Sequence, residues 1–287
     1  LHKGNVFSIL LTWLIARANQ GQILLRIDDL DRDRVRSEYI EDIFRTLDWL
    51  GIDFDEGPEN LASFESEFSQ KKRVDLYRQA LDQLRNSGVK VFNCACSRSD
   101  ISRLSGDGSY PGTCVDKKLD TTGNAIRIYT KEHQPIVFQD EVLGKVSLNL
   151  SQKMKHFVIW KKDDSSAYQL SSLVDDLYFN VNTVVRGSDL IESTAAQLFL
   201  ATGLKEHRFT EVNFSHHPLI QQHSRKLSKS QGADAVEKTE PNRMTLLREF
   251  SDWLKIKPQV TTLPELREAF EMSHVKELGW TIHHRHN

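Results

Sequence analysis

The chain has 287 residues, 39% of them hydrophobic and 27% charged, and a formal net charge of -2. These proportions are ordinary for a globular protein with a sizeable core, and no apolar run approaches the roughly 20 residues that a membrane-spanning helix needs. They exclude a membrane-spanning protein and a general positive field for nucleic acid. We therefore expect a soluble protein in which any RNA site is a local patch.

The first part of the chain alternates between helix and strand patterns. Residues 5–18 are apolar on nearly all sides, which predicts a buried helix, and the apolar run over residues 23–27 predicts a buried strand. Residues 37–50 place apolar side chains at helical spacing, with Ser37 as the expected N-cap and Gly51 as the stop. This order of helix, strand and helix favours a parallel α/β sheet.

The middle of the chain is richer in β-strand patterns. We expect a helix over residues 69–85 and a strand over residues 89–92, followed by short β-rich runs between residues 125 and 160. These runs predict an inserted, mostly β subdomain. The α/β pattern then resumes, with an expected helix over residues 168–177, a strand over residues 183–185, a helix over residues 191–201 and a helical tail beyond residue 241.

Three cysteines, Cys94, Cys96 and Cys114, lie within one short stretch. An odd number of cysteines in a chain without a secretion signal indicates a reducing compartment, so we expect a cytoplasmic protein. Together with Tyr110 the cysteines offer three thiolates and a phenolate, which is enough for a closed tetrahedral zinc site. Buried free cysteines beside a packed tyrosine are the alternative.

Two short motifs, far apart in the sequence, suit the handling of phosphate. Residues 2–5, His-Lys-Gly-Asn, open the first predicted helix, where a glycine lets phosphates approach the helix N-terminus. Residues 226–230, Lys-Leu-Ser-Lys-Ser, supply two ammonium groups and a hydroxyl that can close over a triphosphate. Each motif alone is commonly a helix cap or a solvated loop. Together they indicate the transfer of AMP from ATP to a carboxylate, because that reaction builds negative charge on the phosphates.

On these motifs the chain resembles the catalytic domain of class I glutamyl-tRNA synthetases. Residues 2–5 are similar to the HIGH motif, with Asn5 in place of its second histidine, and residues 226–230 are similar to KMSKS, with Leu227 in place of methionine. Further matching segments are residues 25–29, 49–52, 168–170, 175–176 and 185–189. The resemblance implies an α/β fold with a Rossmann-type catalytic core that uses ATP with magnesium and binds L-glutamate.

The resemblance also implies roles for particular residues. The ATP-binding residues would be His2, Gly4, Asn5, Lys226, Ser228 and Lys229, among which His2, Lys226 and Lys229 would be catalytic. Glutamate needs an acid for its ammonium group and an arginine or tyrosine for its carboxylates. Asp28, Tyr168 and Arg186 match the family positions that contact glutamate. Asp28 stands where the family usually has glutamate, so its carboxylate sits one methylene further back.

Length and the cysteines separate the branches of this family. The chain is too short beyond Ser230 to hold the large anticodon-binding region of a full glutamyl-tRNA synthetase. It resembles the truncated paralogue family of glutamyl-Q tRNA(Asp) synthetases, whose zinc pattern, Cys-x-Cys followed by Tyr-x-x-x-Cys, is similar to residues 94–114 here. That resemblance implies activation of glutamate without tRNA and transfer to queuosine in the anticodon of tRNA(Asp). A fragment of an ordinary glutamyl-tRNA synthetase and an inactive RNA-binding paralogue are the alternatives.

The expected organisation has three units and a short tail, and we expect a monomer. The three units are residues 1–88 as the first half of the catalytic core, residues 89–165 as a zinc-bearing inserted subdomain of acceptor type, and residues 166–235 as the second half of the core with the KMSKS-like loop. Residues 236–287 form the helical tail. The family carries a strand rich in Arg, Ser and Pro before the HIGH motif, and we expect the core to lack it here.

Overall fold

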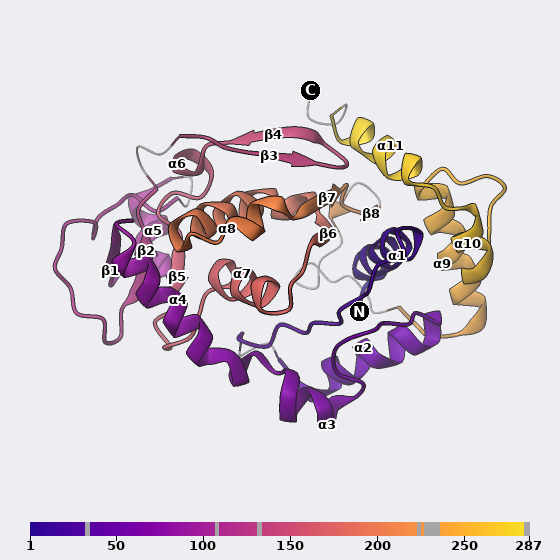
Figure 1. Cartoon of the computed structure of the whole chain (residues 1–287), viewed down its shortest axis with the longest axis horizontal. Coiled ribbons are helices and arrows are strands. Elements are labelled where there is room, and N and C mark those ends of the chain that lie inside the picture. The colour runs from indigo at the N-terminus through magenta and orange to yellow at the C-terminus, as the bar shows by residue number, and fades with distance from the viewer. Residues whose placement is uncertain (32–34, 107–108, 131–133, 223–224, 227–235, 284–287) are drawn as a thin grey trace.

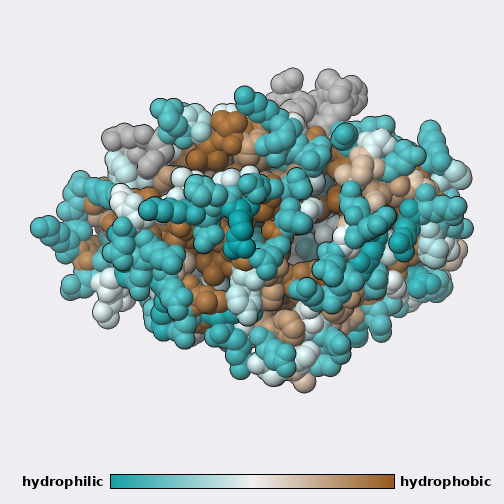
Figure 2. Space-filling model, viewed as in Figure 1, coloured by the Kyte–Doolittle hydropathy of each residue, from teal (hydrophilic) through white to brown (hydrophobic). Residues whose placement is uncertain are grey.

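The computed structural model describes the chain except for residues 32–34, 107–108, 131–133, 223–224, 227–235 and 284–287. Figure 1 shows an elongated molecule with a small sheet at one end, a larger sheet in the middle and a helical tail at the other end. On the face shown in Figure 2, hydrophilic residues cover most of the surface, and apolar residues show in patches between them. Within the described residues, no helix combines the length and the apolar character needed to span a membrane.

Helical elements open and close the chain, and the short strands lie between residues 91 and 226. The α-helices are α1 (Lys3–Ala18), α2 (Ser37–Leu50), α3 (Leu61–Ser63), α4 (Val74–Asn86), α5 (Arg98–Leu104), α6 (Leu150–Lys153), α7 (Tyr168–Tyr178), α8 (Ile191–Leu204), α9 (Glu240–Trp253), α10 (Leu263–Ala269) and α11 (Met272–His283). Four shorter helical turns are η1 (Phe64–Phe68), η2 (Gln70–Arg73), η3 (Ser188–Leu190) and η4 (His207–Glu211). The strands are β1 (Val91–Cys94), β2 (Ala125–Ile128), β3 (Ile136–Asp140), β4 (Gly144–Leu148), β5 (Val158–Trp160), β6 (Thr183–Gly187), β7 (Asn213–His217), β8 (Gln221–Gln222) and β9 (Arg225–Lys226).

The central sheet has the strand order β4-β3-β7-β6. Strand β7 runs parallel to β3 on one side and to β6 on the other, and Arg186 of β6 stands opposite His216 of β7. Successive side chains of a strand point to opposite faces. Val184 belongs to the core that contains α7 and α8, whereas Val185 packs against the core of α1 and α9. The sheet therefore separates two hydrophobic cores, and Arg186 lies on the α8 side.

The mixed α/β class expected from the sequence is confirmed, and so is the buried first helix. Helix α1 buries side chains around most of its circumference, and Phe7 meets Phe250 of α9 edge-on, with ring centroids 5.0 Å apart. Helix α2 ends as expected at Gly51, whose φ of 74° is left-handed. Its N-cap, however, is Arg36 rather than Ser37, and no side chain caps that end.

The strand expected over residues 23–27 is not formed. Leu24 makes an isolated parallel bridge to Glu56, and the backbone of Ile23 accepts hydrogen bonds from the amides of Asp55 and Glu56. A strand needs a continuous ladder with a neighbour, and Ile23 and Leu24 instead line a cavity on their way past β6. The prediction was wrong because an apolar run indicates that a segment is buried but does not indicate which segment it pairs with.

Two further elements begin later than expected. The helix expected from residue 69 begins at Val74, because Asp29 accepts hydrogen bonds from the Ser69 hydroxyl and the Gln70 amide, at 2.6 and 2.7 Å. These bonds accompany a separate 3-10 turn, η2, before α4. The strand expected at residues 89–92 runs instead from Val91 to Cys94, which brings the first cysteine into the sheet.

The β-rich middle segment contributes strands to both sheets. Strands β1, β2 and β5 form an antiparallel sheet of their own in the order β1-β2-β5. The hairpin of β3 and β4, although it falls in the range expected for the insertion, pairs with β7 of the central sheet. The division of the chain at residues 88, 165 and 235 stays a prediction.

Candidate functional site

The N-terminus of α1 is closed by His2. The Nδ1 atom of His2 accepts a hydrogen bond from the Asn5 amide, and the Asn5 side chain accepts one from the His2 amide, both at 3.4 Å. A Cβ on Gly4 would lie 3.1 Å from the His2 ring, so glycine leaves room for the ring to fold over the helix end. The three residues expected at the front of an ATP site therefore form one capping unit at the positive end of a helix dipole.

Asp28 is the exposed member of a cluster of charges whose other carboxylate, that of Asp176, is buried. Its carboxylate accepts a hydrogen bond from Arg26 at 2.8 Å, and the same guanidinium binds Asp176 of α7 and the hydroxyl of Ser172. Burial acts to lower the pKa of Arg26, but the charges of Asp28 and Asp176 outweigh it and raise the pKa above its usual value. Asp28 is thus one of two carboxylates that form ion pairs with the guanidinium of Arg26.

Arg186 and Tyr168, both expected to contact glutamate, lie together. The Nη1 atom of Arg186 donates to the Tyr168 hydroxyl at 3.5 Å. The other nitrogen atoms of the guanidinium bind residues of α8 and β7. Nη2 donates to the Thr194 hydroxyl and, at 2.9 Å, to Oε1 of Gln197. Nε donates to Nε2 of His216 at 3.3 Å. Burial lowers the pKa of Arg186, while Tyr168 acts in the opposite direction.

Asp176 links the two groups. Burial raises the pKa of its carboxyl, and the positive charges of Arg26 and Arg186 counteract this shift. A cavity of about 730 Å³ runs between α1 and β6, and Arg26, Asp28 and Asp176 belong to its wall. This is a volume typical of small-molecule sites. Arg186 and Tyr168 do not line this cavity, so the structure links them to Asp28 only through the charges of Arg26 and Asp176.

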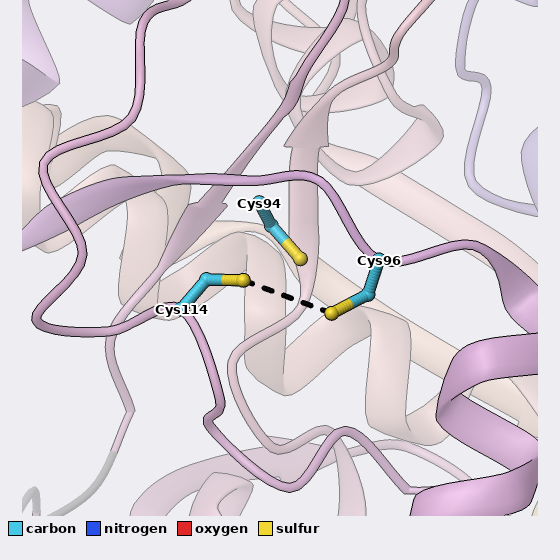
Figure 3. A group of neighbouring side chains, drawn as sticks. All are labelled: Cys94, Cys96 and Cys114. Atoms are coloured by element: carbon cyan, nitrogen blue, oxygen red, sulfur yellow. Dashed lines mark hydrogen bonds between the residues drawn. The ribbon is translucent and has the colours of Figure 1, made fainter.

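The cysteine cluster lies in the other sheet. The three sulfur atoms lie within 4.8 Å of one another, and Figure 3 shows their side chains converging from β1, the turn after it and the segment of Cys114. The sulfur atoms of Cys96 and Cys114 are 3.7 Å apart. The Tyr110 hydroxyl accepts a hydrogen bond from the Cys114 amide at 2.9 Å and also interacts with the thiols of Cys94 and Cys114.

The thiols of this cluster differ in their electrostatics. The hydrogen bond with Thr113 acts to lower the pKa of the Cys96 thiol, but burial and the neighbouring thiols raise it. Burial acts to raise the pKa of the Cys114 thiol, but hydrogen bonds from Tyr110 and the backbone of Ala95 lower it to about 7. Burial raises the pKa of the Tyr110 hydroxyl above its usual value. Three thiols and a hydroxyl that converge in a largely buried position match the donor number and softness of a tetrahedral zinc site.

Comparison with known proteins places this geometry in a family. A model described as tRNA synthetases class I (E and Q), catalytic domain, matches residues 1–252. The chain belongs to this family. A protein named Glutamyl-Q tRNA(Asp) synthetase from Nitratidesulfovibrio vulgaris is 34% identical over 70% of this chain and 65% of its own length. Another with that name, from Photobacterium profundum, is 32% identical over 92% of this chain and 80% of its own length.

Relatives with longer chains match as well. A glutamate-tRNA ligase from Desulfosudis oleivorans is 29% identical over 96% of this chain and 59% of its own length. The chain spans 47% to 65% of the length of the first three curated relatives. The crystal structure of glutamate-tRNA synthetase from Elizabethkingia anophelis superposes with a TM-score of 0.75 at 21% identity, over 96% of this chain and 64% of that chain. The class I synthetase fold expected from the sequence is confirmed.

The KMSKS-like motif is described only at its start. Lys226 belongs to β9, which pairs with β8 in a short hairpin, and the structure describes its backbone alone. Ser228 and Lys229 lie outside the described residues. Their expected roles in this synthetase domain stay predictions.

Several residues that hold the site were not expected from the sequence. Thr194 and Gln197 are polar residues three positions apart in a largely apolar helix, and this spacing, which places them on one face, is a signal that could have found them. Arg26 lies in a segment that matches the family, but the sequence alone gives it no role. Asp140 and His216 carried no usable signal, because their contact depends on the pairing of β3 with β7.

Proposed function

We propose that the protein activates L-glutamate with ATP and magnesium as glutamyl-adenylate and transfers the glutamyl group to queuosine in the anticodon of tRNA(Asp). The observation that carries the proposal is the paired arrangement of Arg186 with Tyr168 and of Asp28 with Asp176 in a class I (E and Q) synthetase domain. Opposite charges set apart in one region match glutamate, which carries an ammonium group and two carboxylates. A relative that bears the glutamyl-Q name, 80% of whose length the chain covers, supports the choice of acceptor.

Each group has a role in the proposed reaction. Arg186 and Tyr168 hold a carboxylate of glutamate, and Asp28 and Asp176 face its ammonium group. A carboxylate oxygen of glutamate attacks the α-phosphorus of ATP, and pyrophosphate leaves with the electrons of the broken bond. The helix end at His2 and the side chains of Lys226 and Lys229 stabilise the charge that builds on the phosphates. A nucleophile of the acceptor then attacks the glutamyl carbonyl and releases AMP.

We further propose that Cys94, Cys96, Tyr110 and Cys114 hold a structural zinc ion. The convergence of the three sulfurs on the Tyr110 hydroxyl supports this assignment. Zinc in this position would supply four bonds between β1, the turn before α5 and the segment of residues 110–114, with no coordination position left for a catalytic water. The protein would act as a monomer in the cytoplasm.

The first test is pyrophosphate exchange. The full-length protein with glutamate, ATP, magnesium and no tRNA should incorporate labelled pyrophosphate into ATP. Exchange that begins only after tRNA is added would instead favour an ordinary glutamyl-tRNA synthetase. Lys229→Ala should abolish the exchange with an unchanged circular dichroism spectrum, whereas an inactive RNA-binding paralogue would show no exchange in either protein.

The second test concerns the acceptor. Labelled glutamate is supplied with tRNA(Asp) that contains queuosine and with the same tRNA that lacks it. The proposal requires label on the queuosine-containing RNA alone. Label on both RNAs would contradict the choice of acceptor while leaving the activation of glutamate intact.

A further inference from the structure

A buried relay of polar side chains crosses three strands behind Arg186. Asp140 ends β3, His216 lies in β7 and Arg186 lies in β6, and these strands are neighbours in the central sheet. The side chains of Asp140 and His216 are both fully buried. No step of the proposed reaction uses either residue, although a buried ionisable pair is costly to keep unless its partners are well placed.

The contacts of Asp140 indicate the direction of its hydrogen bond with His216. The carboxylate of Asp140 accepts from the amides of Val142 and Leu143, both at 2.9 Å, so it is an acceptor in a fixed orientation. It lies 2.6 Å from Nδ1 of His216. Hydrogen bonding to His216 and to the backbone holds the pKa of Asp140 below its usual value despite burial. An ionised Asp140 needs a donor, so the imidazole proton sits on Nδ1.

The other ring nitrogen then faces Arg186 as an acceptor. Nε2 of His216 lies 3.3 Å from Nε of Arg186 and 2.7 Å from the Thr194 hydroxyl. Burial, together with the nearby positive charge of Arg186, lowers the pKa of His216, which keeps the ring neutral at ordinary pH. Thr194 accepts from Arg186 and can donate to His216, so the chain of donors runs from Arg186 through Thr194 and His216 to Asp140.

Gln197 supports the same interpretation. Its Oε1 accepts from Arg186 at 2.9 Å, and its Nε2 is a buried donor that meets no partner among the described residues. A buried unsatisfied donor is destabilising. An apolar side chain would avoid this cost, and Gln197 offsets it only through the acceptor that it presents to Arg186. Besides the Tyr168 hydroxyl, three acceptors from α8 and β7 therefore converge on one guanidinium.

We propose that Asp140 and His216 are positioning residues for Arg186: Asp140 fixes the tautomer of His216, and His216 then aims the guanidinium at the carboxylate of glutamate. This inference rests on the proposed function for the identity of the ligand. The relay does not touch glutamate or ATP. It acts on affinity for glutamate by presenting Arg186 in one orientation before the substrate arrives, which lowers the cost of ordering the site on binding.

Asp140→Asn tests the relay at its origin. The side-chain amide of the asparagine would donate to Nδ1 of His216, so the imidazole proton would move to Nε2. The Nε2–H group would then face two other donors, Nε–H of Arg186 and the Thr194 hydroxyl. We expect the KM for glutamate in pyrophosphate exchange to rise about tenfold to a hundredfold, the effect of losing one buried charge-assisted hydrogen bond. The KM for ATP should change by no more than about twofold, because ATP does not use Arg186.

A pair of variants at His216 separates positioning from folding. His216→Gln can place an oxygen near the position of Nε2 and keep an acceptor for Arg186, whereas His216→Asn keeps only the donor to Asp140. Glutamate KM should stay closer to wild type in the first variant than in the second. Phe209→Leu is the matched control, because Phe209 of η4 packs on Phe214 of β7 and takes part in none of the hydrogen bonds of the relay. It should lower stability with both KM values unchanged.

Histidine-selective ¹⁵N NMR of the wild-type protein tests the tautomer without any activity. The Nδ1–H form of His216 is expected, and conversion to the Nε2–H form in Asp140→Asn. An Nε2–H form in the wild type would overturn the inference, as would equal changes in the KM for glutamate and for ATP in both His216 variants. Absence of exchange in a wild type that shows the Nδ1–H form would instead remove the proposed function and leave the relay standing as a support for Arg186.

Discussion

The polar network on α7 and the cysteine cluster are both buried, but they are completed in different ways. Asp175 of α7 accepts hydrogen bonds from Arg73, Tyr77 and Gln70, at 2.7, 2.8 and 2.8 Å, so each charge or dipole already has a protein partner. In the cysteine cluster the sulfurs face one another at distances suited to a shared ion rather than to strong hydrogen bonds. The first region is completed by protein partners, and the second offers the donor atoms of the proposed zinc site.

Removing the proposed ion should have the largest effect. Cys114→Ser should lower bound zinc from about one equivalent to a small fraction. Because a ligand present at about 1,000 times its Kd stabilises the folded state by about 4 kcal/mol, unfolding of the region should become easier by a similar amount. Metal analysis and thermal unfolding with and without a chelator measure the two effects.

The control for that variant is Ser97→Ala in the same region. Ser97 caps α5 by accepting a hydrogen bond from the Asp100 amide, so its removal should cost about 1 kcal/mol without loss of a thiol. Zinc content should remain near one equivalent. If Cys114→Ser keeps its zinc, or if the wild type binds none, the cysteine cluster does not depend on an ion and does not differ from the α7 network in this respect.

The α7 network should be the next most sensitive. Asp175→Asn leaves Arg73, whose side chain is 6% exposed, without its counter-charge. Breaking one partner of a buried ion pair costs about 3 to 5 kcal/mol, and because asparagine keeps the shape and one acceptor of Asp175, the loss should lie at the lower end of that range. The midpoint of urea denaturation should fall accordingly. The difference in stability between Asp175→Asn and the wild type should be the same with and without a chelator, because the α7 network needs no ion.

An exposed ion pair provides the comparison. Glu41 and Arg45 lie four residues apart on α2, and both side chains are about half exposed. Glu41→Gln should cost no more than about 0.5 kcal/mol. If Asp175→Asn lowers the free energy of unfolding by no more than Glu41→Gln does, the buried α7 network does not stabilise the fold as proposed.

These regions also differ in how far sequence could anticipate them. The cysteine cluster was predicted residue by residue, because its members are close in the chain and their spacing restricts the geometry. The meeting of Arg186 with Tyr168 followed from family resemblance alone. The hydrogen bonds that fix Arg186 depend on strand order, and one sequence carries no record of which strands become neighbours. The expected strand at residues 23–27 failed for the same reason, since a strand is defined by its partner.

The smallest expected effect is a dependence of stability on pH that belongs to the central sheet. Burial lowers the pKa of His216 and of His217 below 6.5 in the folded state. The charged groups that face His216 are Asp140, Arg186 and Asp189. The ring of His217 faces Asp189 and contacts the Ser8 hydroxyl and the Pro218 carbonyl.

The sign of the effect follows from proton uptake. Just below pH 6.5 the unfolded chain binds more protons than the folded protein, so stability is full above that pH and is lost as the pH falls through this window. The urea midpoint should therefore drop between about pH 7 and about pH 5.5, and His217→Asn should reduce the drop because one of the two buried rings is gone. The same titration on Glu41→Gln serves as the control and should follow the wild type. A midpoint that rises on acidification would mean that the imidazoles are charged in the folded protein, and the acceptor that His216 offers to Arg186 would then not exist.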